Sequence, residues 1–296
     1  MEIATATGLS EDKMREVDMH SFINLITVVY TQLHLLGMED ERVKEKLSPV
    51  IADTEELTAA IRRQNEAYLN KEWVTLYIER LLNAVEETGE LAGEAHHLQN
   101  MRSIMKVFQI RFDELRQNWA APEKWHRFNI AAFQEDFRKF FYAMEKNSRG
   151  RYRIIKNIAE QEEKDYLVNF EISSDYNDGS CIYMPLMLKD VLRDLIANAR
   201  KYTPPGGRIQ IGILQKAGQL RMVVEDNGHG IPEEEIPRVI EYGYRASNVR
   251  DKIRTMGGGF GLTKSWQITR RLNGRMWIES ELGRGTKVTL HIPIPE

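Results

Sequence analysis

The chain has 296 residues, enough for two modest domains that each bury a core. Charged residues make up 29% of it and the formal net charge is −3, so no basic field favours binding to nucleic acid. One cysteine, Cys181, excludes a disulfide framework and a cysteine-rich zinc site. No apolar run reaches the roughly 20 residues that a membrane helix needs, and no signal peptide opens the chain, so we expect a cytoplasmic protein without membrane insertion.

Residues 1–10 show no periodicity, and we expect them to form a disordered lead-in. The next stretch, residues 13–36, is predicted to be an amphipathic helix. Its apolar stripe steps by three and four positions and consists of Phe22, Ile26, Val29, Leu33 and Leu36. A polar stripe that includes His20 and Asn24 steps in the same way. His20 lies about 200° around the helix from Phe22, so it faces outward if Phe22 lies in a core.

Residues 37–40 end this helix, and Ser48-Pro49 is typical of the start of another. Residues 71–119 are predicted to form one long helix that packs along its length, as in a coiled coil or bundle. Its apolar residues recur every seven positions: Tyr77, Ala84, Leu91, Leu98, Met105, Phe112 and Trp119. These stripes offer more apolar helix face than one hairpin covers, so we expect a homodimer through the N-terminal helices.

Ala120-Ala121-Pro122 is the predicted domain boundary, which gives a helical domain over residues 1–121 and a second domain over residues 122–296. In the second domain we expect helices at residues 128–144, 185–202 and 262–272, and strands at residues 167–172, 208–214, 220–225, 276–280 and 286–292. Strands with helices gathered on one face form an α/β sandwich. The predicted fold class is therefore α+β, with an N-terminal helical hairpin or coiled-coil bundle followed by a sandwich.

The stretch V-V-E-D-N-G-H-G-I-P, from Val223 to Pro232, places a carboxylate before two glycines. Gly228 and Gly230 let the backbone turn sharply and approach a flat ligand without a Cβ in the way. Asp226, buried beside them, is suited to accept a hydrogen bond from an exocyclic amine. Taken alone, this spacing also describes an ordinary turn in which Asp226 ends a strand.

Three further motifs flank this stretch: L-R-D-L-I-A-N-A-R-K-Y-T-P-P-G-G from Leu192, G-G-G-F-G-L-T from Gly257, and L-G-R-G-T from Leu282. Together the four motifs resemble, in order and spacing, the N, G1, G2 and G3 boxes of the histidine-kinase-type ATPases, the GHKL superfamily. The resemblance covers roughly residues 125–296. It implies a Bergerat-type α/β sandwich that binds ATP with Mg²⁺.

The resemblance also implies roles for residues of the first two boxes. Asn198 matches the asparagine that coordinates Mg²⁺, and an amide oxygen is a suitable hard ligand. Lys201 would neutralise phosphate charge, and Tyr202 matches the ring that packs on adenine. Asp226 matches the adenine-binding carboxylate. Asp194, one turn before Asn198, occupies the place where related ATPases hold a base.

The glycine-rich third box implies a phosphate site. Gly257, Gly259 and Gly261 lead into a helix at Leu262, and exposed N–H groups at a helix start favour phosphate. A flexible hinge is the alternative interpretation. Between this box and the G1 box lies a basic segment where the family keeps a mobile lid, and Arg245 is its predicted ATP-binding cation. Thr286, the last residue of the fourth box, is also predicted to bind ATP.

His20 is the predicted phosphoryl acceptor, because D-M-H-S-F-I-N resembles the H box of a dimerisation and phosphotransfer helix. Asn24 matches the position that helps to orient water when the partner is dephosphorylated. The family usually places an acid directly after the histidine, whereas this chain has Ser21. Glu16, four residues before His20, is a candidate replacement base. His96 and His97 are weaker candidate acceptors, and an ordinary surface histidine is the alternative for His20.

The resemblance as a whole implies a histidine kinase of a two-component system. It would phosphorylate His20 from ATP and pass the phosphoryl group to an aspartate of a response-regulator receiver domain. One alternative is a degenerate kinase that acts as a nucleotide-binding scaffold or sequesters a partner. Another is a serine/threonine kinase of the anti-sigma type, or a conformational ATPase. A standard phosphotransfer hairpin needs only two helices, so residues 71–119 depart from the family pattern.

Overall fold

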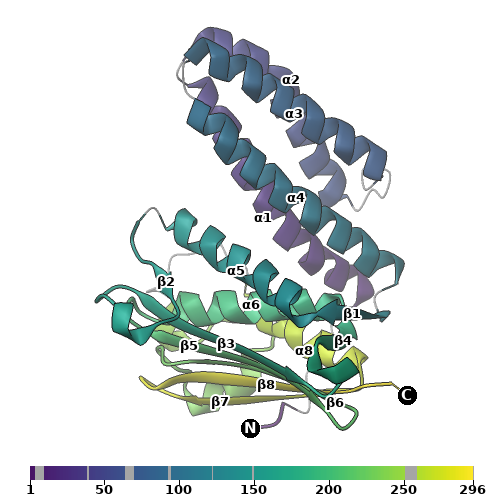
Figure 1. Ribbon diagram of the computed structural model, residues 1–296, viewed down its shortest axis with the longest axis vertical. Coiled ribbons are helices and arrows are strands. Elements are labelled where there is room, and N and C mark those ends of the chain that lie inside the picture. The colour runs from purple at the N-terminus through teal and green to yellow at the C-terminus, as the bar shows by residue number, and fades with distance from the viewer. Residues whose placement is uncertain are drawn as a thin grey trace. The chain divides into compact units, whose positions relative to one another are not determined.

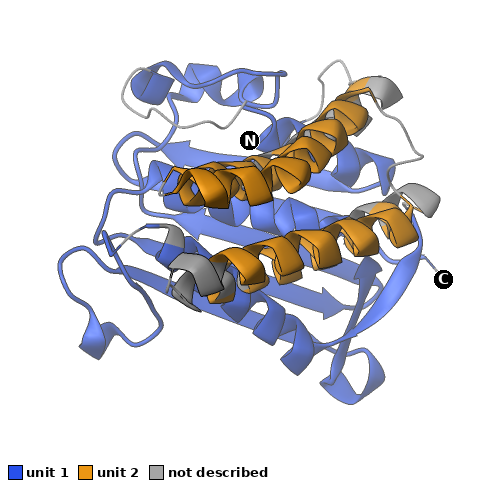
Figure 2. Cartoon of the chain, turned by 90° about the horizontal axis from the view of Figure 1, so that it is seen from above, with its two compact units in different colours: residues 1–9, 122–296 blue, residues 10–121 orange. Residues whose placement is uncertain are grey.

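The computed structural model describes residues 1–3, 10–38, 40–63, 70–92, 95–121, 123–148, 150–250 and 259–295. The chain divides into two compact units, shown in Figures 1 and 2. Residues 10–121 form the helical unit. Residues 1–9 and 122–296 form the α/β unit. The chain thus divides near the expected boundary, but residues 1–9 group with the second unit and not with the first.

The helical unit is a bundle of four helices, α1 (Glu11–Gly37), α2 (Glu41–Arg62), α3 (Lys71–Ala92) and α4 (Ala95–Ala120). Each helix packs against two others, in the ring α1–α2–α3–α4 that closes from α4 back to α1. Side-chain caps mark the first two helix starts. Ser10 accepts a hydrogen bond from the N–H of Lys13, and Asp40 accepts one from the N–H of Arg42 at 2.8 Å.

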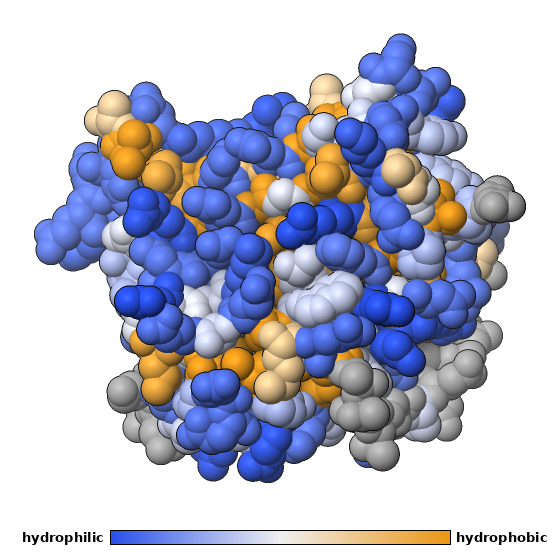
Figure 3. Space-filling model, turned by 90° about the horizontal axis from the view of Figure 1, so that it is seen from below, coloured by the Kyte–Doolittle hydropathy of each residue, from blue (hydrophilic) through white to orange (hydrophobic). Residues whose placement is uncertain are grey.

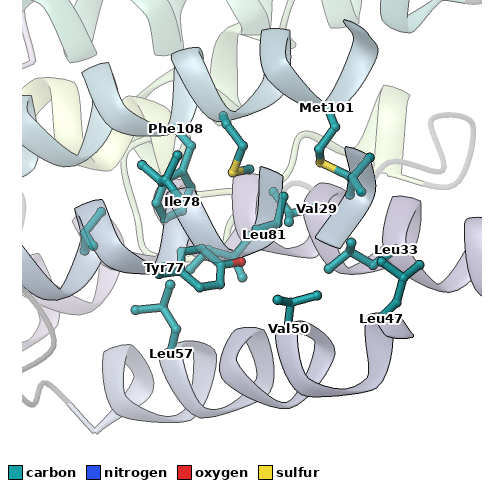
Figure 4. Close-up of a cluster of buried hydrophobic side chains, with 14 of the residues drawn as sticks. Val29, Leu33, Leu47, Val50, Leu57, Tyr77, Ile78, Leu81, Met101 and Phe108 are labelled. Carbon is teal, nitrogen blue, oxygen red and sulfur yellow. The ribbon is translucent and has the colours of Figure 1, made fainter. Parts of the chain in front are cut away.

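One apolar core fills the bundle, and all four helices contribute to it (Figure 4). The predicted stripe of α1 is buried in this core throughout, from Phe22 to Leu36. The ring of Phe22 lies 4.9 Å from that of Phe108 in α4, measured between centroids. The Tyr77 and Thr54 hydroxyls form a buried hydrogen bond of 2.8 Å between α3 and α2. Most of the bundle's stability therefore comes from this shared apolar interior.

Two predictions about this unit are wrong. The expected single helix over residues 71–119 is instead two helices, α3 before residues 93–94 and α4 after them. These two helices pack against each other. The seven-residue spacing continues across the pair because both helices face the same core. The expected helix start at Ser48-Pro49 lies inside α2, which continues through the proline. Val43 before the proline and Val50 after it are both buried, so the apolar face of the helix extends across it.

The α/β unit contains a six-stranded mixed sheet in the order β2-β3-β5-β6-β8-β7. Its strands are β2 (Ile154–Ile155), β3 (Tyr166–Ser174), β5 (Arg208–Lys216), β6 (Gln219–Asp226), β7 (Arg275–Glu281) and β8 (Gly285–Pro293). A separate pair joins β1 (Trp125–Asn129) to β4 (Cys181–Pro185) in antiparallel fashion. Three longer helices, α5 (Ile130–Asn147), α6 (Met187–Tyr202) and α8 (Gly261–Arg271), lie over one face of the large sheet (Figure 1).

Alternation along the central strands explains this layering. In β5 the residues Ile209, Ile211 and Ile213 are buried toward the helices, whereas Gln210 and Leu214 point to the other face and are exposed. The α+β fold class and its sandwich domain are thus confirmed. On the face seen in Figure 3, apolar side chains lie among polar ones.

On the face of the sheet that the helices do not cover, β5 and β6 border a shallow depression of about 580 Å³. Leu214, Arg221 and Val223 are among the residues that line it. None of its lining residues is a predicted ligand-binding residue. None of the helices in the described part of the chain is long and apolar enough to cross a membrane.

Residues 1–3 are ordered, whereas the whole of residues 1–10 was expected to be a disordered lead-in. Met1–Ile3 extends the sheet beside β7, with Glu2 paired to Trp277 in antiparallel register. The N–H of Ile3 donates to the carbonyl of Met276 at 2.9 Å, and the N–H of Ile278 donates to the carbonyl of Met1 at 3.0 Å. Three residues show no periodicity because their order comes from pairing with a distant strand.

Candidate functional site

The helix α6 carries four of the predicted site residues near its C-terminal end. Asp194 and Asn198 lie one turn apart and are both partly buried. Both face the first residue of α8. A Cβ added to Gly261 would lie 2.9 Å from Asn198 Nδ2 and 3.6 Å from Asp194 Cβ. The absence of a side chain at Gly261 therefore lets α8 begin directly against these two side chains.

Asp226 ends β6 and is paired in register with Thr286 in β8. The N–H of Gly228 donates to its Oδ1 at 2.8 Å. Burial raises the pKa of the Asp226 carboxyl to about 6, although the hydrogen bond from Gly228 acts in the opposite direction. A buried carboxylate with spare acceptor capacity is suited to a ligand that brings its own donors.

Glycines hold the backbone around Asp226 in close contact. A Cβ at Gly228 would run into the carbonyl oxygen of Tyr202, and it would lie 2.8 Å from Asp226 Oδ1. Gly230 and Gly285 have φ values of +65° and +115°, which disfavour any residue with a side chain. A Cβ at Gly285 would overlap the carbonyl oxygen of Asp226. The G1 and G3 motifs thus form one tightly packed loop region at the end of β6.

Thr203 is a site residue that the motifs did not single out. Its buried hydroxyl lies beside the Asp226 carboxyl, whose charged form it favours, without the geometry of a full hydrogen bond. A hydroxyl placed in this way can turn toward a polar ligand or an ordered water. Its place directly after Tyr202 is the sequence signal that could have identified it.

Positively charged side chains lie close to one another near the C-terminal end of α6. Burial, the charge of Arg245 and the charge of Arg200 together lower the pKa of Lys201 to about 8. The Lys201 ammonium also lies 5.0 Å from the centroid of the Tyr202 ring. Cations that destabilise one another in this way are stabilised by a bound anion. The structure therefore brings Lys201, Tyr202 and Arg245 near one another.

The third box is described only in part, because Gly257 lies outside the described residues. Gly259 has a φ of +78° and packs against Gly243, where a Cβ would come within 3.0 Å of backbone. Gly261 begins α8, and the partly buried Leu262 follows it. The start of α8 lies beside Asn198, the predicted metal ligand. The first N–H groups of a helix are able to bind an anion.

Lys264 is a second residue that the sequence analysis missed. It lies in the first turn of α8, its side chain is 4% exposed, and its Nζ is 3.8 Å from Asp194 Oδ2. A buried ammonium is stable only with compensating partners, and Asp194 is one of them. Lysine between apolar positions of a predicted helix was the signal that could have indicated this contact.

The phosphotransfer residues can be placed on an element but not further. His20 and Asn24 belong to α1, and their side chains lie outside the described residues, as do those of Glu16 and Ser21. Phe22, on the stripe opposite His20, is buried. His96 and His97 belong to α4, and their side chains are likewise outside the described residues.

The residues of this site fit an adenine nucleotide with a divalent cation. The glycines bring backbone segments close together around Asp226, the Thr203 hydroxyl lies beside that carboxyl, and the cations suit phosphates. Among the described residues no cluster of three His, Cys, Asp or Glu side chains could hold a metal ion. Asn198 would therefore share Mg²⁺ with phosphate and water oxygens, which is a common arrangement for this ion.

Comparison with known proteins finds sequences and structures that are similar to the part of the chain that carries this site. Residues 184–296 match the model of the histidine kinase-, DNA gyrase B- and HSP90-like ATPases. The adaptive-response sensory kinase SasA of Synechococcus elongatus is 38% identical over 112 residues, which are 38% of this chain and 28% of that protein. The sensor histidine kinase WalK of Bacillus subtilis is 33% identical over 112 residues, which are 37% of this chain and 18% of that protein.

The matched part thus spans less than a third of either relative. Among solved structures, the catalytic domain of histidine kinase ThkA is 20% identical and aligns with a TM-score of 0.41. That alignment covers 57% of this chain and 95% of the other.

Proposed function

We propose that this chain is a histidine kinase of a two-component system, because residues 184–296 match the model of the histidine kinase-, DNA gyrase B- and HSP90-like ATPases and resemble sensor histidine kinases. It binds ATP with Mg²⁺ in the α/β unit and phosphorylates His20 in α1. The observation that carries this proposal is the convergence of Asn198, Asp226 and the start of α8 at one end of the sheet.

Each part of the nucleotide has a partner in this proposal. Asp226 accepts a hydrogen bond from the adenine amine, and the Tyr202 ring packs on the base. Lys201 and Arg245 balance the phosphate charge, and the N–H groups at the start of α8 bind phosphate oxygens. Asn198 would hold Mg²⁺, which would supply positive charge beside the phosphates.

In the reaction, the bond between the γ-phosphorus and the bridging oxygen of ATP breaks and a phosphorus–nitrogen bond to the His20 imidazole forms. ADP leaves, and the imidazole proton passes to a base. Ser21 cannot act as that base at neutral pH, so Glu16 is our candidate for it. The phosphoryl group then moves to an aspartate of a receiver domain, and Asn24 orients the water for its later hydrolysis.

Phosphoamino-acid analysis after incubation with labelled ATP tests this proposal. We expect label that is stable in base and labile in acid, and we expect His20→Gln to abolish it. ATP affinity in His20→Gln should equal that of the wild type, because the nucleotide residues lie in the other unit. If label survives in His20→Gln, the acceptor is another residue, and His96 and His97 are the next candidates to test.

Calorimetry tests the nucleotide site independently. Asp226→Asn and Asn198→Ala should each weaken ATP binding about ten- to a hundredfold, which corresponds to the roughly 1.5–3 kcal/mol of a charge-assisted hydrogen bond. The loss in Asn198→Ala should depend on Mg²⁺, whereas the loss in Asp226→Asn should not. Equal ATP affinity in Asp226→Asn and wild type would refute the adenine assignment.

Ser21 favours one second candidate, a degenerate kinase that holds nucleotide and acts as a scaffold. This protein would bind ATP and yield no acid-labile label. Ser21→Glu, which restores an acid next to His20, distinguishes a kinase that lacks its base from a scaffold. Label that appears only in Ser21→Glu would indicate that the serine removed the activity.

A further inference from the structure

The predicted homodimer rested on apolar helix faces that one hairpin leaves uncovered. A hairpin of two amphipathic helices buries only part of its stripes, so it needs another apolar surface to complete a core. In this chain the other surface is present. The α3–α4 hairpin packs on the α1–α2 hairpin through both of its helices, α3 on α2 and α4 on α1.

The residues of the α1 stripe show how completely this second hairpin covers the first. Ile26, Val29 and Leu33 are fully buried within the single chain, and Phe22 is 3% exposed. Phe22 reaches its burial by contact with α4, where it lies against Phe108 and Phe112. A partner chain would find this stripe already occupied.

Polar contacts join the two hairpins as well. On the α2–α3 side, Arg80 lies 3.1 Å from Asp53, and Lys46 lies 3.1 Å from Glu87. The buried hydrogen bond between the hydroxyls of Tyr77 and Thr54 connects the same two helices. Exposed ion pairs add little stability, but the buried hydroxyl pair specifies how the hairpins meet. The hairpins therefore form one folded unit with a defined register.

Some apolar side chains do remain on the outside of the bundle. Among the bundle side chains that the structure describes, the large ones are Met38, 82% exposed at the C-cap of α1, and Val28, Leu35, Leu76, Val107 and Ile110, each between 41% and 52% exposed. They belong to α1 and its C-cap, α3 and α4, and single apolar residues at a surface are ordinary. A stable interface buries about 800 Å² on each partner around an apolar centre, which a continuous stripe supplies better than scattered residues.

From this arrangement we infer that the α3–α4 hairpin takes the place of a second subunit's hairpin, so that the chain is a monomer with a complete four-helix phosphotransfer bundle. The part of this inference that concerns catalysis rests on the proposed function. In a monomer, the ATP bound by a chain phosphorylates His20 of the same chain. The reaction is then first order in protein, with a rate constant that does not depend on protein concentration.

Light scattering of the full chain between about 1 and 100 µM tests the assembly directly. We expect the mass of one chain throughout this range. Copies of the chain that carry two different tags and are expressed together should not purify with one another. A mass of two chains, or recovery of both tags after purification through one of them, would overturn the inference and restore the predicted homodimer.

Complementation between two inactive variants tests the reaction in cis. His20→Gln lacks the acceptor and Asn198→Ala lacks the metal ligand, so a mixed dimer that works in trans would label the Asn198→Ala chain. We expect co-expressed variants to give no more label than either variant alone, whereas co-expressed wild-type chains with the same tags give full label. Label on the Asn198→Ala chain at a substantial fraction of the wild-type level would refute the inference.

These experiments separate the inference from the kinase proposal. If the wild-type chain binds ATP and yields no phosphohistidine, the kinase proposal fails and the mass alone decides between monomer and dimer. If the wild type is labelled and the mass is that of two chains, the kinase proposal stands and the inference fails.

Discussion

The carboxyl group of Asp226 is expected to titrate within an accessible pH range. Burial raises its pKa from 3.8 to about 6, so the folded chain holds this proton more tightly than the unfolded chain. The resulting contribution to folding is fully present below about pH 4 and is lost as the pH rises through about 6. Denaturant unfolding of the ligand-free protein should show this decline, and Asp226→Asn should remove it.

The affinity for ATP should also depend on the ionisation of Asp226, but it should increase as the pH rises. If the ionised carboxylate accepts the adenine amine, ATP affinity at pH 5 should be about tenfold lower than at pH 7, because most Asp226 side chains are then protonated. The phosphates of ATP titrate in this range too. Asp226→Asn is the matched control, since it shares the phosphate effect. The same pH dependence in both proteins would contradict the assignment of Asp226.

Asp194 has a structural neighbour that affects any test of its catalytic role. Asp194→Asn leaves the buried Lys264 ammonium without this counter-charge, and we expect a loss of about 1–3 kcal/mol in the free energy of unfolding. Lys264→Met should cost less, since Asp194 is the more exposed partner. The double variant should be more stable than Asp194→Asn alone. Urea unfolding measures all three, and an Asp194→Asn protein as stable as wild type would contradict this account.

Among the secondary-structure elements, the start of α8 depends on a glycine for its approach to α6. In Gly261→Ala the new Cβ would lie 2.9 Å from Asn198 Nδ2, the flexible end of a side chain that can move aside. We therefore expect near-normal stability together with weaker Mg²⁺-dependent ATP binding. Gly212→Ala is the control, because a Cβ there meets nothing within 4 Å. Equal ATP affinity in both variants would show that Asn198 does not need its present position.

The same comparison of elements shows what periodicity could and could not predict. Alternation predicted the two strands at residues 208–214 and 220–225, which form the hairpin of β5 and β6, and both residues of its turn, Ala217 and Gly218, have positive φ. The break between α3 and α4 was missed because heptad spacing is the same for one long helix and for two helices that share a core. The short strands β1 and β4 were missed since they pair with each other at a distance of more than 50 residues.

The predicted site likewise contains residues that the sequence motifs indicated and residues that they did not. Box motifs identified Asn198, Asp226 and the glycines, because close backbone approach leaves a glycine at a defined spacing. Thr203 and Lys264 carried weaker signals, because their roles depend on which side chains lie opposite them in the folded chain. Local patterns therefore predict the backbone of a binding site better than the side chains that surround it.

For the molecule as a whole, two compact units with separate cores should unfold in two transitions. ATP with Mg²⁺ should raise only the transition of the α/β unit, by RT ln(1 + [L]/Kd) in free energy. Tyr77→Phe removes the buried hydrogen bond to Thr54 and should lower only the transition of the helical unit, by about 0.5–1.5 kcal/mol. Calorimetry with both perturbations checks this, and a single transition that both perturbations shift would contradict it.

The pairing of Met1–Ile3 with β7 has a consequence for the order in which the protein is made. Residues 1–3 are made before the strand β7 that they bind, and the Trp266 indole N–H that donates to the Ile3 carbonyl at 3.1 Å is also made later. Residues 10–121 have all their core partners within one continuous stretch, so the bundle can fold while synthesis continues. The α/β unit can complete its sheet only after β7 and β8 have been made. By then the bundle of residues 10–121, which separates residues 1–9 from residues 122–296 in the sequence, can already have folded.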